Sequence, residues 1–384
     1  MRIAMVLDAW DDPANGGVVS TRRFTERLRA GGHEITVVAT GAPEPGKVVL
    51  PTFYLPFVGG VMRRMRFPFA RPDARILADV LSRQDVVHVH FPFWLGIRAV
   101  KLARAAGVPV VATFHVQAEH LLYNVGIRNE ALVTQGYRFL LRTVYDKVDR
   151  VICPSEFTRH ELTRYGLKSR ATVISNGVPP EFRPSPPGTG PAFGGRAMVL
   201  AVGRLAREKR HDLLIEAVRR SRHAARVQLV ILGAGPLRPE LERQGATLPN
   251  PPVFDFLPPE ELVPYYGAAT LYVHASEVEA ECMSVLEALA CGTPCLIADS
   301  PRSATPQFAL SERYLFRSGS LESLVGRLDA LLDDAPGLAA DRGAALALAG
   351  DYRIEASVAR LHDVYREVAE AGGRRPSREP ALRS

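Results

Sequence analysis

The chain has 384 residues, enough for two domains of ordinary size, and 47% of them are hydrophobic, which supports packed cores and excludes a largely disordered chain. The net charge of +7 favours acidic partners such as nucleotides or an anionic membrane surface. The sequence has no aromatic-interleaved basic motif of the kind that binds nucleic acid, so we expect no nucleic-acid partner.

The cysteines and the apolar runs indicate the compartment. Cys153, Cys282, Cys291 and Cys295 lie in or beside apolar runs, without a CxxC pair or nearby histidines at zinc spacing. We therefore expect small buried residues in a reducing compartment. The apolar start "RIAMVL" is too short for a signal peptide, and no run reaches the ~18 apolar residues that a membrane span needs. The sequence predicts a cytoplasmic protein.

Short β-branched runs alternate with amphipathic stretches in the first half of the chain. A strand at 2–7, a helix at 20–32 that ends in glycine and a strand at 33–40 make a βαβ unit. Further strands follow at intervals that leave room for crossover helices: 85–91, 108–115, 150–155 and 171–177. This pattern predicts a parallel, doubly wound sheet and an N-terminal Rossmann-like domain over 1–177.

The same pattern restarts after a stretch crowded with proline and glycine, "NGVPPEFRPSPPGTGPAFGG", which predicts an interdomain linker over 178–195. A helix is expected from about Asp212, among strands at 197–204, 227–235, 253–258, 271–276, 293–299 and 313–316. A second Rossmann-like domain is therefore predicted over 196–352. Two such domains in tandem imply a cleft between the carboxyl ends of their strands.

The C-terminal part of the chain divides into a helix and a tail. Residues 353–372 form an amphipathic pattern, and we expect this helix to pack back on the first domain. Residues 373–384 are rich in arginine, glycine and proline and predict a disordered tail.

Two cations follow the first strand of the second domain. In "RLAREK", Arg204 and Lys209 lie five positions apart at a strand exit, where both side chains can converge on an anion such as a diphosphate. Taken alone, an arginine and a lysine in such a loop would be ordinary solvated cations. Their position favours the anion site.

Glycines at strand exits favour a close approach of the backbone to a ligand. "LGAGP" places Gly233 and Gly235 after a strand but lacks the third glycine of a GxGxxG fingerprint. "NGGVVS" places Gly16 and Gly17 between the first strand and its helix, where backbone N–H groups can meet phosphate or a sugar. A tight βα turn is the alternative for this segment. Gly203, beside Arg204, is expected in the same kind of site.

The stretch "SEVEAECMSVLEALACGTPC" holds four glutamates in a segment that otherwise has a buried pattern. If its helix begins near Cys282, Glu279 lies in the loop before the helix and Glu287 one to two turns along it. A carboxylate there can accept two hydrogen bonds from the vicinal hydroxyls of a ribose. Capping or solvating the helix is the alternative for Glu287, but "ALACGTPC" after it is almost wholly apolar, so the charge needs a partner. Glu277 and Glu281 are expected to be loop acids.

Histidines mark the strand ends of the first domain. His115 follows a strand and should reach the cleft, although a lone histidine more often satisfies a local hydrogen bond. His88, His90 and His115, with Glu119 and His120 nearby, also suggest a metal site. Their positions on two different strands make the metal the weaker interpretation.

Residues 53–75 interleave aromatic and aliphatic residues with five arginines. Such a segment can lie in a bilayer interface while the arginines meet anionic headgroups. The alternative is a solvated helix and loop over the N-terminal sheet, because prolines and glycines interrupt any long amphipathic helix.

The combination R-x4-K, then E-x7-E followed by "EALACGTP", resembles the retaining glycosyltransferases of family 4, which have the GT-B fold of two Rossmann-like domains facing each other across a cleft and use nucleotide-diphosphate sugars. "DRVICPSEFTRHEL", "VISNGV", "GRLAREKRHDLLIEA" and "FLPPEELVPYY" also look like family signatures in the expected order, so the resemblance covers nearly the whole chain.

The resemblance implies roles for the residues singled out above. Arg204 and Lys209 would neutralise the donor diphosphate, Glu287 would bind the ribose hydroxyls and Glu279 would face the transferred sugar. The first turn of the following helix, with Met283, Ser284 and Val285, would complete the donor site, and His115 would contact the donor sugar from the first domain.

"VHVHFPFWLG" and "VATFHVQAEHLLYNVG" are similar to the acceptor domain of the lipid-glycosylating branch, particularly bacterial diacylglycerol glucosyltransferases. This implies transfer of glucose from UDP-glucose to a membrane lipid at the inner face of the cell membrane. GDP-mannose with phosphatidylinositol or a soluble acceptor is the alternative. After "CGTP" the sequence departs from the family, since "DSPRSATPQFA" stands where many members have a paired glycine and a glutamate. The resemblance therefore does not decide the identity of the donor sugar. Glu281 is an acid where a hydrophobic or small residue is usual.

The chain has no Asp-x-Asp triplet, so cations and a helix N-terminus would have to stabilise the leaving diphosphate. We therefore expect metal-independent transfer without a cofactor. Retention is implied by the family resemblance alone, and front-face attack with the leaving phosphate as base is expected because no residue presents itself as an enzymatic nucleophile. A sugar-nucleotide epimerase and a non-catalytic nucleotide-sugar-binding protein are the rival classes.

Overall fold

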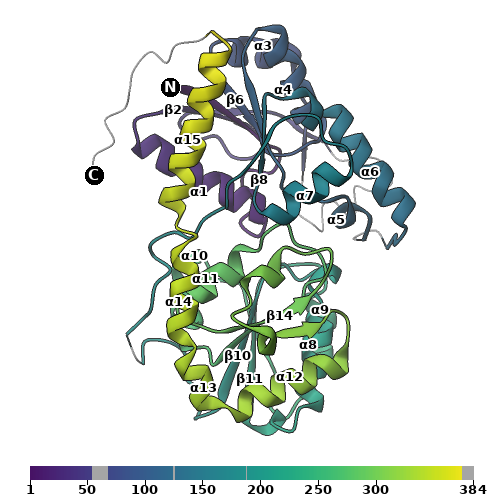
Figure 1. Ribbon diagram of the computed structural model, residues 1–384, viewed down its shortest axis with the longest axis vertical. Helices are drawn as coiled ribbons and strands as arrows, with labels where there is room; N and C mark the ends of the chain where they lie inside the picture. The colour runs from purple at the N-terminus through teal and green to yellow at the C-terminus, as the bar shows by residue number, and fades with distance from the viewer. Residues whose placement is uncertain (54–67, 124–125, 187, 374–384) are drawn as a thin grey trace. The chain divides into compact units, whose positions relative to one another are not determined.

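The chain folds into two compact units. A computed structural model describes residues 1–53, 68–123, 126–186 and 188–373. The first unit comprises Met1–Leu122, Ile127–Asn176 and the part of the chain from Glu355, and the second is built mainly from Gly177–Ile354. Each unit is centred on a parallel sheet with helices packed on it (Figure 1), so the prediction of two Rossmann-like domains is confirmed.

The first unit is organised around a seven-stranded parallel sheet of order β3-β2-β1-β6-β7-β8-β9. Its strands are β1 (Arg2–Val6), β2 (Glu34–Ala39), β3 (Lys47–Val49), β6 (Val86–Val89), β7 (Val110–Thr113), β8 (Arg150–Cys153) and β9 (Ala171–Val173). A separate antiparallel pair joins β4 (Thr52–Phe53) to β5 (Phe69–Ala70). The chain builds outward from β1 to β3 and then returns to the other side of β1. The loops after β1 and β6 therefore lie at the topological switch point, where such sheets bind ligands.

Helices cover both faces of this sheet. They are α1 (Gly16–Ala30), α3 (Ala74–Ser82), α4 (Trp94–Ala105), α5 (Ala118–Tyr123), α6 (Glu130–Thr143), α7 (Glu156–Arg164) and α15 (Ile354–Ala371), with a 3-10 turn at Tyr145–Lys147. α1 and α15 lie side by side (Figure 1), and both contribute apolar side chains to the cluster that contains Ile3 and Met5 of β1. The chain thus returns at its C-terminal helix to the core of the first unit.

The first helix begins earlier than the predicted residue 20. Asn15 caps it, because its side-chain oxygen accepts hydrogen bonds from the N–H groups of Gly17 (3.0 Å) and Val18 (3.3 Å). The two glycines weaken the helical pattern in the sequence, and the cap compensates for them. The N–H groups of Gly17 and Val18 are therefore already engaged within the chain.

The second unit has a six-stranded parallel sheet of order β12-β11-β10-β13-β14-β15. The strands are β10 (Ala197–Val202), β11 (Val227–Leu232), β12 (Val253–Asp255), β13 (Leu271–His274), β14 (Cys295–Asp299) and β15 (Leu315–Arg317), and each matches a predicted strand. The strand order reverses at β10, between β11 and β13. The loops after β10 and β13 are therefore neighbours at the switch point of this sheet.

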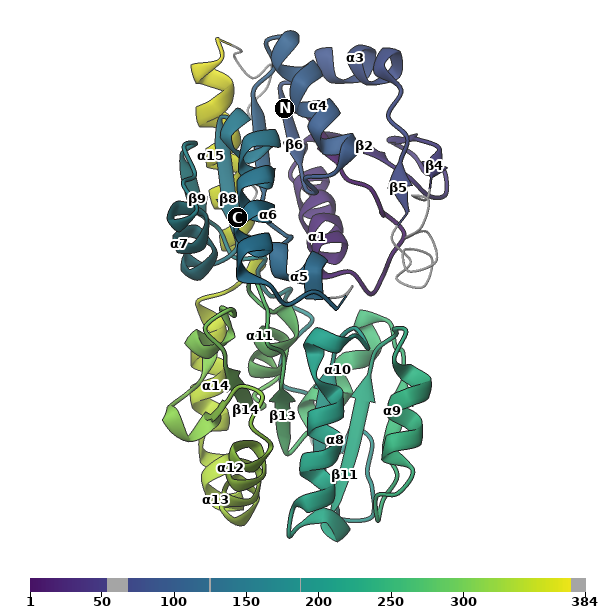
Figure 2. The same cartoon turned by 90° about the vertical axis from the view of Figure 1, so that its right-hand side faces the viewer.

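The helices of the second unit pack on its sheet in two separate apolar clusters. One contains α8 (His211–Arg220), α9 (Arg238–Gly245), α12 (Leu321–Asp333) and α13 (Ala335–Ala340), and the other contains α10 (Pro259–Ala268), α11 (Met283–Ala290) and α14 (Arg342–Gly350). Figure 2 shows α8 and α9 beside β11. Short 3-10 turns lie at Arg207–Lys209, Ala224–Arg226, Thr305–Phe308 and Glu312–Tyr314.

Residues 178–195, predicted to be a linker, contain no helix or strand among their described positions but pack on the second unit. Val178 forms a parallel bridge with Arg353, and Phe182 is fully buried in the cluster of α10 and α11. Proline and glycine therefore exclude regular structure here without preventing attachment to the core.

Most of the segment predicted to contact a membrane, 54–67 of 53–75, lies outside the described residues, as does the predicted tail at 374–384. At the described ends, the Phe53 and Phe69 rings are 6.0 Å apart and Phe53 meets Trp94 edge-on at 5.4 Å. In the part of the chain that the structure describes, no helix combines the length and apolar character of a membrane span.

Candidate functional site

The strand exits of the second unit bring Lys209 and Glu279 together. After β10, Gly203 adopts a φ of +153°, and the chain makes the 3-10 turn Arg207–Lys209. The Lys209 ammonium forms an ion pair with the Glu279 carboxylate, which comes from the loop after β13. Burial alone lowers the pKa of Lys209, but the charges of Glu279 and Cys282 outweigh it and hold the pKa above its usual value. The lysine therefore stays a cation.

His274, the last residue of β13, extends this cluster. Its Nε2 lies 3.1 Å from Glu279 Oε1, and its Nδ1 lies 3.7 Å from the Cys282 Sγ. Burial lowers the pKa of His274, whereas Cys282 and Glu279 raise it, to about 9. The end of β13 and the loop after it thus bring together a carboxylate, an imidazole and a cysteine sulfur.

The helix of the glutamate-rich stretch begins where the sequence predicted. α11 starts at Met283, directly after Cys282, and Ser284 in its first turn accepts a hydrogen bond from Tyr272 (2.8 Å). Val285 is buried beneath the same turn. The first turn of α11 is therefore fixed to the strand below it, with its N-terminus at the carboxyl edge of the sheet.

Glu287 is buried, as its apolar surroundings in the sequence suggested. The partner that its charge was expected to need includes Tyr266 of α10. The Tyr266 hydroxyl donates a hydrogen bond of 3.0 Å to Glu287 Oε2. Burial, followed by the charge of Glu287, raises the pKa of Tyr266 well above its usual value, so it remains a donor. Sequence reasoning did not identify Tyr266, because its distance of 21 positions from Glu287 reflects packing between two helices.

The other two glutamates of the stretch are buried as well. Glu277 pairs with Arg210, a residue with a left-handed φ of +53° between the 3-10 turn and α8. Glu281 has an exposed fraction of only 2%. The Arg210–Glu277 pair ties the loop after β10 to the loop after β13 and so supports the position of Lys209 and Glu279.

Arg204 lies half-buried in the loop after β10, at the start of the same segment as Lys209. The glycines around it have a packing role. A Cβ on Gly233 would lie 1.8 Å from the Gly203 carbonyl oxygen, and one on Gly235 would lie 2.4 Å from that of Leu205. The absence of side chains at Gly233 and Gly235 therefore lets the loop after β11 contact the loop after β10.

In the first unit, the structure brings Gly17 of α1 and His115, two residues after β7, into contact. A Cβ on Gly17 would lie 3.2 Å from the Cβ and Cγ of His115. The His115 Nε2 lies 3.3 Å from the Nδ1 of His90, and burial lowers the pKa of His115 to about 4. His115 is therefore a neutral imidazole. Gly16 begins the same helix.

The suggested metal group of the first unit does not form. His88 bonds to Tyr365 at 2.5 Å and to Thr113 at 2.7 Å, and Glu119 accepts a hydrogen bond from Tyr137 at 2.9 Å. Within the described ranges, the histidine, cysteine and acid side chains close enough for one ion are instead His274, Glu279 and Cys282. Sequence reasoning passed over His274, although its place at the end of β13 follows the same rule that selected His115.

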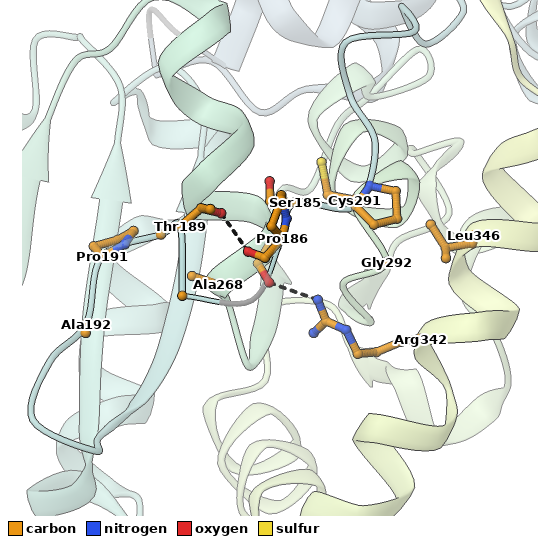
Figure 3. A pocket seen from close by; sticks show the side chains of 14 residues that line it. Ser185, Pro186, Thr189, Pro191, Ala192, Ala268, Cys291, Gly292, Arg342 and Leu346 are labelled. Carbon is orange, nitrogen blue, oxygen red and sulfur yellow. Dashed lines mark hydrogen bonds between the residues drawn. The ribbon is translucent and has the colours of Figure 1, made fainter.

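A cavity of about 490 Å³ lies elsewhere on the second unit (Figure 3). Cys291 and Gly292 line it just before β14, Ala268 lines it before β13, and Arg342 closes one side by donating to the Gly267 carbonyl at 2.9 Å. These positions precede the strands, so the cavity lies at the amino edge of the sheet. It contains none of the predicted site residues.

The chain matches two sequence families. Residues 14–182 match Glycosyltransferase Family 4, and residues 189–345 match Glycosyl transferases group 1. Among curated relatives, the alpha-monoglucosyldiacylglycerol synthase of Streptococcus pneumoniae is 26% identical over 78% of this chain and 72% of its own length. A GDP-mannose-dependent alpha-mannosyltransferase of Mycobacterium tuberculosis is 30% identical over 78% of this chain and 79% of its own.

A solved structure agrees with the fold. Anabaena HepE in complex with UDP and glucose superposes with a TM-score of 0.77 at 16% identity, covering 96% of this chain and 100% of that one. At this identity the likeness concerns the fold alone, which is GT-B. Taken with the family matches and the 30% identical relative, it leads to one conclusion: the chain is a glycosyltransferase of family 4 with the GT-B fold.

Proposed function

We propose that the chain transfers a hexose, with glucose favoured, from a nucleotide-diphosphate sugar, with UDP favoured, to a hydroxyl of a membrane lipid such as diacylglycerol, with retention of configuration. The observation that carries the proposal is the arrangement at the switch point of the second unit. There a permanently cationic Lys209 is held by Glu279, and Glu287 is held by Tyr266.

Each residue has a task in this proposal. Lys209 and Arg204 face the donor diphosphate and stabilise its charge as the bond to the sugar breaks, with help from the N-terminus of α11. Glu287, oriented by Tyr266, accepts hydrogen bonds from the ribose hydroxyls. Glu279 faces the sugar. The leaving phosphate takes the proton of the acceptor hydroxyl, which attacks the face that the diphosphate leaves.

His115 supplies a neutral hydrogen-bonding group to the donor sugar. Its low pKa means that it neither carries a charge nor acts as an acid at neutral pH. The proposal includes no cofactor and no metal in the transfer step, because Lys209 and Arg204 supply the positive charge.

A lipid acceptor is supported by the surface of the first unit. Trp94 is 59% exposed at the edge of an aromatic group that includes Phe53 and Phe69. On α6, Leu132 and Phe139 are also exposed. Exposed apolar groups on a protein of net charge +7 suit peripheral binding to an anionic membrane, at the inner face of the cell membrane in this proposal.

GDP-mannose is the second candidate donor, with phosphatidylinositol or a soluble acceptor. It is favoured by the 30% identity with the mycobacterial GDP-mannose-dependent relative. The departure "DSPRSATPQFA" leaves both sugars open.

The test is a matrix of labelled UDP-glucose and GDP-mannose against vesicles with diacylglycerol, vesicles with phosphatidylinositol and soluble acceptors. We expect label from UDP-glucose to enter the organic phase with diacylglycerol, as an α-glycoside. A β-glycoside would contradict retention, label only in water-soluble product would contradict the lipid acceptor, and release of an epimerised donor without acceptor would favour an epimerase.

A matched pair of variants tests the role of Lys209. We expect Lys209→Ala to lower kcat about 100-fold or more, because the leaving diphosphate loses its cation. Arg207→Ala removes an exposed cation from the same 3-10 turn and should leave kcat nearly unchanged. Equal activity of both variants would contradict the role of Lys209.

A further inference from the structure

Three different metal-ligating side chains converge at the carboxyl end of β13. His274 ends the strand, and Glu279 and Cys282 lie in the loop that leads to α11. All three are buried, and one ligand atom of each lies within 4.8 Å of the others. The cysteine is eight positions from the histidine, which is longer than the spacing of typical zinc motifs. The fold brings the two side chains together, and a search for such motifs does not find them.

The geometry suits a borderline-soft metal ion. Bonds of about 2.3 Å to sulfur and 2.0 Å to nitrogen at a tetrahedral angle separate the two ligand atoms by about 3.5 Å. The Cys282 Sγ and His274 Nδ1 are 3.7 Å apart. Glu279 now faces the other ring nitrogen of His274, Nε2, so its carboxylate has to move by about 1–1.5 Å from the 4.8 Å limit to join the Sγ and Nδ1 in one coordination sphere.

The backbone of Cys282 is strained in a way that holds the thiol in place. Its φ of +96° lies in the left-handed region, which glycine adopts freely and other residues adopt only at an energetic cost. Cys282 belongs to the apolar cluster of α10 and α11, and it places its sulfur beside the His274 imidazole at the N-terminus of α11.

We propose that His274, Glu279 and Cys282 bind a Zn²⁺-type transition-metal ion, and that this ion inhibits the enzyme by withdrawing Glu279 from the donor sugar. The binding site stands on the geometry alone, whereas the inhibition rests on the proposed function. Lys209 now pairs with Glu279, so the lysine and the ion compete for the same carboxylate. The ion also displaces the protons of His274 and Cys282 into solvent, so binding strengthens as pH rises. The ion is an inhibitor of the transfer and takes no part in it.

Cobalt is the direct probe, because a thiolate bound to Co²⁺ gives a near-ultraviolet charge-transfer band that needs no substrate. We expect the full-length chain to develop this band with one equivalent of Co²⁺ and to lose it when Zn²⁺ is added. Cys282→Gly should abolish the band and weaken Zn²⁺ binding about 100-fold or more, since the only sulfur ligand is gone.

Controls separate metal binding from damage to the fold. Cys282→Gly relieves the left-handed backbone, so its melting temperature should not fall. Cys153→Ala removes a buried thiol from the first unit and should keep the band. Lys209→Ala should bind Co²⁺ about tenfold more tightly, because Glu279 loses the lysine that competes with the ion for its carboxylate. A missing band, or a band that persists in Cys282→Gly, would overturn the site.

The inhibition is tested separately on the transferase reaction. Zn²⁺ should inhibit transfer by the parent chain, and a chelator should restore it. If the cobalt band forms but Zn²⁺ leaves transfer unchanged, the result contradicts the proposed inhibition and still supports the metal site. If no donor supports transfer, the proposed function fails and the cobalt result still decides the metal site.

Discussion

Single buried charges determine much of the candidate site. The sequence indicated that Glu287 needed a partner because it lies in an apolar helix, and the structure supplies the Tyr266 hydroxyl. Which residue would do so depended on the packing of α10 against α11. A buried carboxylate without such a donor would lose the solvation of its charge, so this contact both stabilises the helix pair and orients the carboxylate.

The Glu287 contact leads to a kinetic prediction. Glu287→Gln should raise the KM for the donor about 10- to 100-fold, since hydrogen bonds to a charged group contribute about 1.5–3 kcal/mol. Tyr266→Phe should raise it less, because the carboxylate remains but loses one orienting bond. Tyr265→Phe, on the same helix, is the control and should match the parent. An unchanged KM in Glu287→Gln would rule out ribose binding by this residue.

Asp8, two residues after β1, provides a test of pH dependence. Burial raises the pKa of Asp8 to about 7, although the hydrogen bond from the Ala70 N–H (2.9 Å) lowers it. Between about pH 4 and pH 7 the unfolded chain loses this proton while the folded chain keeps it, so rising pH favours unfolding. Above pH 7 the destabilisation is complete, on the order of 4 kcal/mol.

Asp8→Asn should remove this contribution. We expect the variant to gain stability relative to the parent as pH rises from about 4 to 7, and to show a constant difference above that. Urea unfolding followed by tryptophan fluorescence measures it, because Trp10 and Trp94 both belong to the first unit. A pH-independent difference between the two proteins would show that Asp8 is ionised throughout.

At the scale of elements, the β-branched runs located every strand of the second sheet, because buried parallel strands have continuous apolar patterns. The loops between them were harder to interpret. Gly233 and Gly235 suggested a close ligand approach, and the structure shows that the loop after β11 uses their missing side chains to contact the loop after β10. The start of α1 was placed too late, because Gly16 and Gly17 weaken the helical pattern in the sequence although Asn15 caps the helix there.

The loop contact predicts a stability change. Gly233→Ala should lower the free energy of unfolding of the second unit by about 3 kcal/mol or more, because its Cβ would lie 1.8 Å from a backbone oxygen of Gly203. Gly326→Ala is the matched control: it is exposed within α12, meets nothing within 4 Å, and should stabilise by about 0.5–1 kcal/mol. Circular dichroism during urea unfolding measures both, with tryptophan fluorescence reporting the first unit separately. Equal stabilities would contradict the packing role.

At the scale of the whole molecule, the C-terminal helix α15 packs in the core of the N-terminal unit. α15 follows the second unit in sequence, yet Leu361, Val364 and Tyr365 are buried in the core of the first. Its amphipathic pattern shows that one face is buried but does not name the surface that covers it. The pairing of Arg150 with Glu367 (2.9 Å) and of His88 with Tyr365 (2.5 Å) adds polar contacts to this docking.

The sequence by itself determined the two Rossmann-like domains, the strands other than the short β3, β4 and β5, and the glutamate-bearing helix, because these follow from local periodicity and from turn residues. Its motifs also pointed to the family. The tertiary structure alone decided which groups meet: Lys209 with Glu279, Glu287 with Tyr266, and His274 with Cys282. The first contact joins neighbouring strand exits, the second joins two packed helices, and the third depends on how the loop after β13 folds back on the end of its strand. The physical reason is that residue spacing along the chain encodes neither strand order, helix packing nor loop conformation.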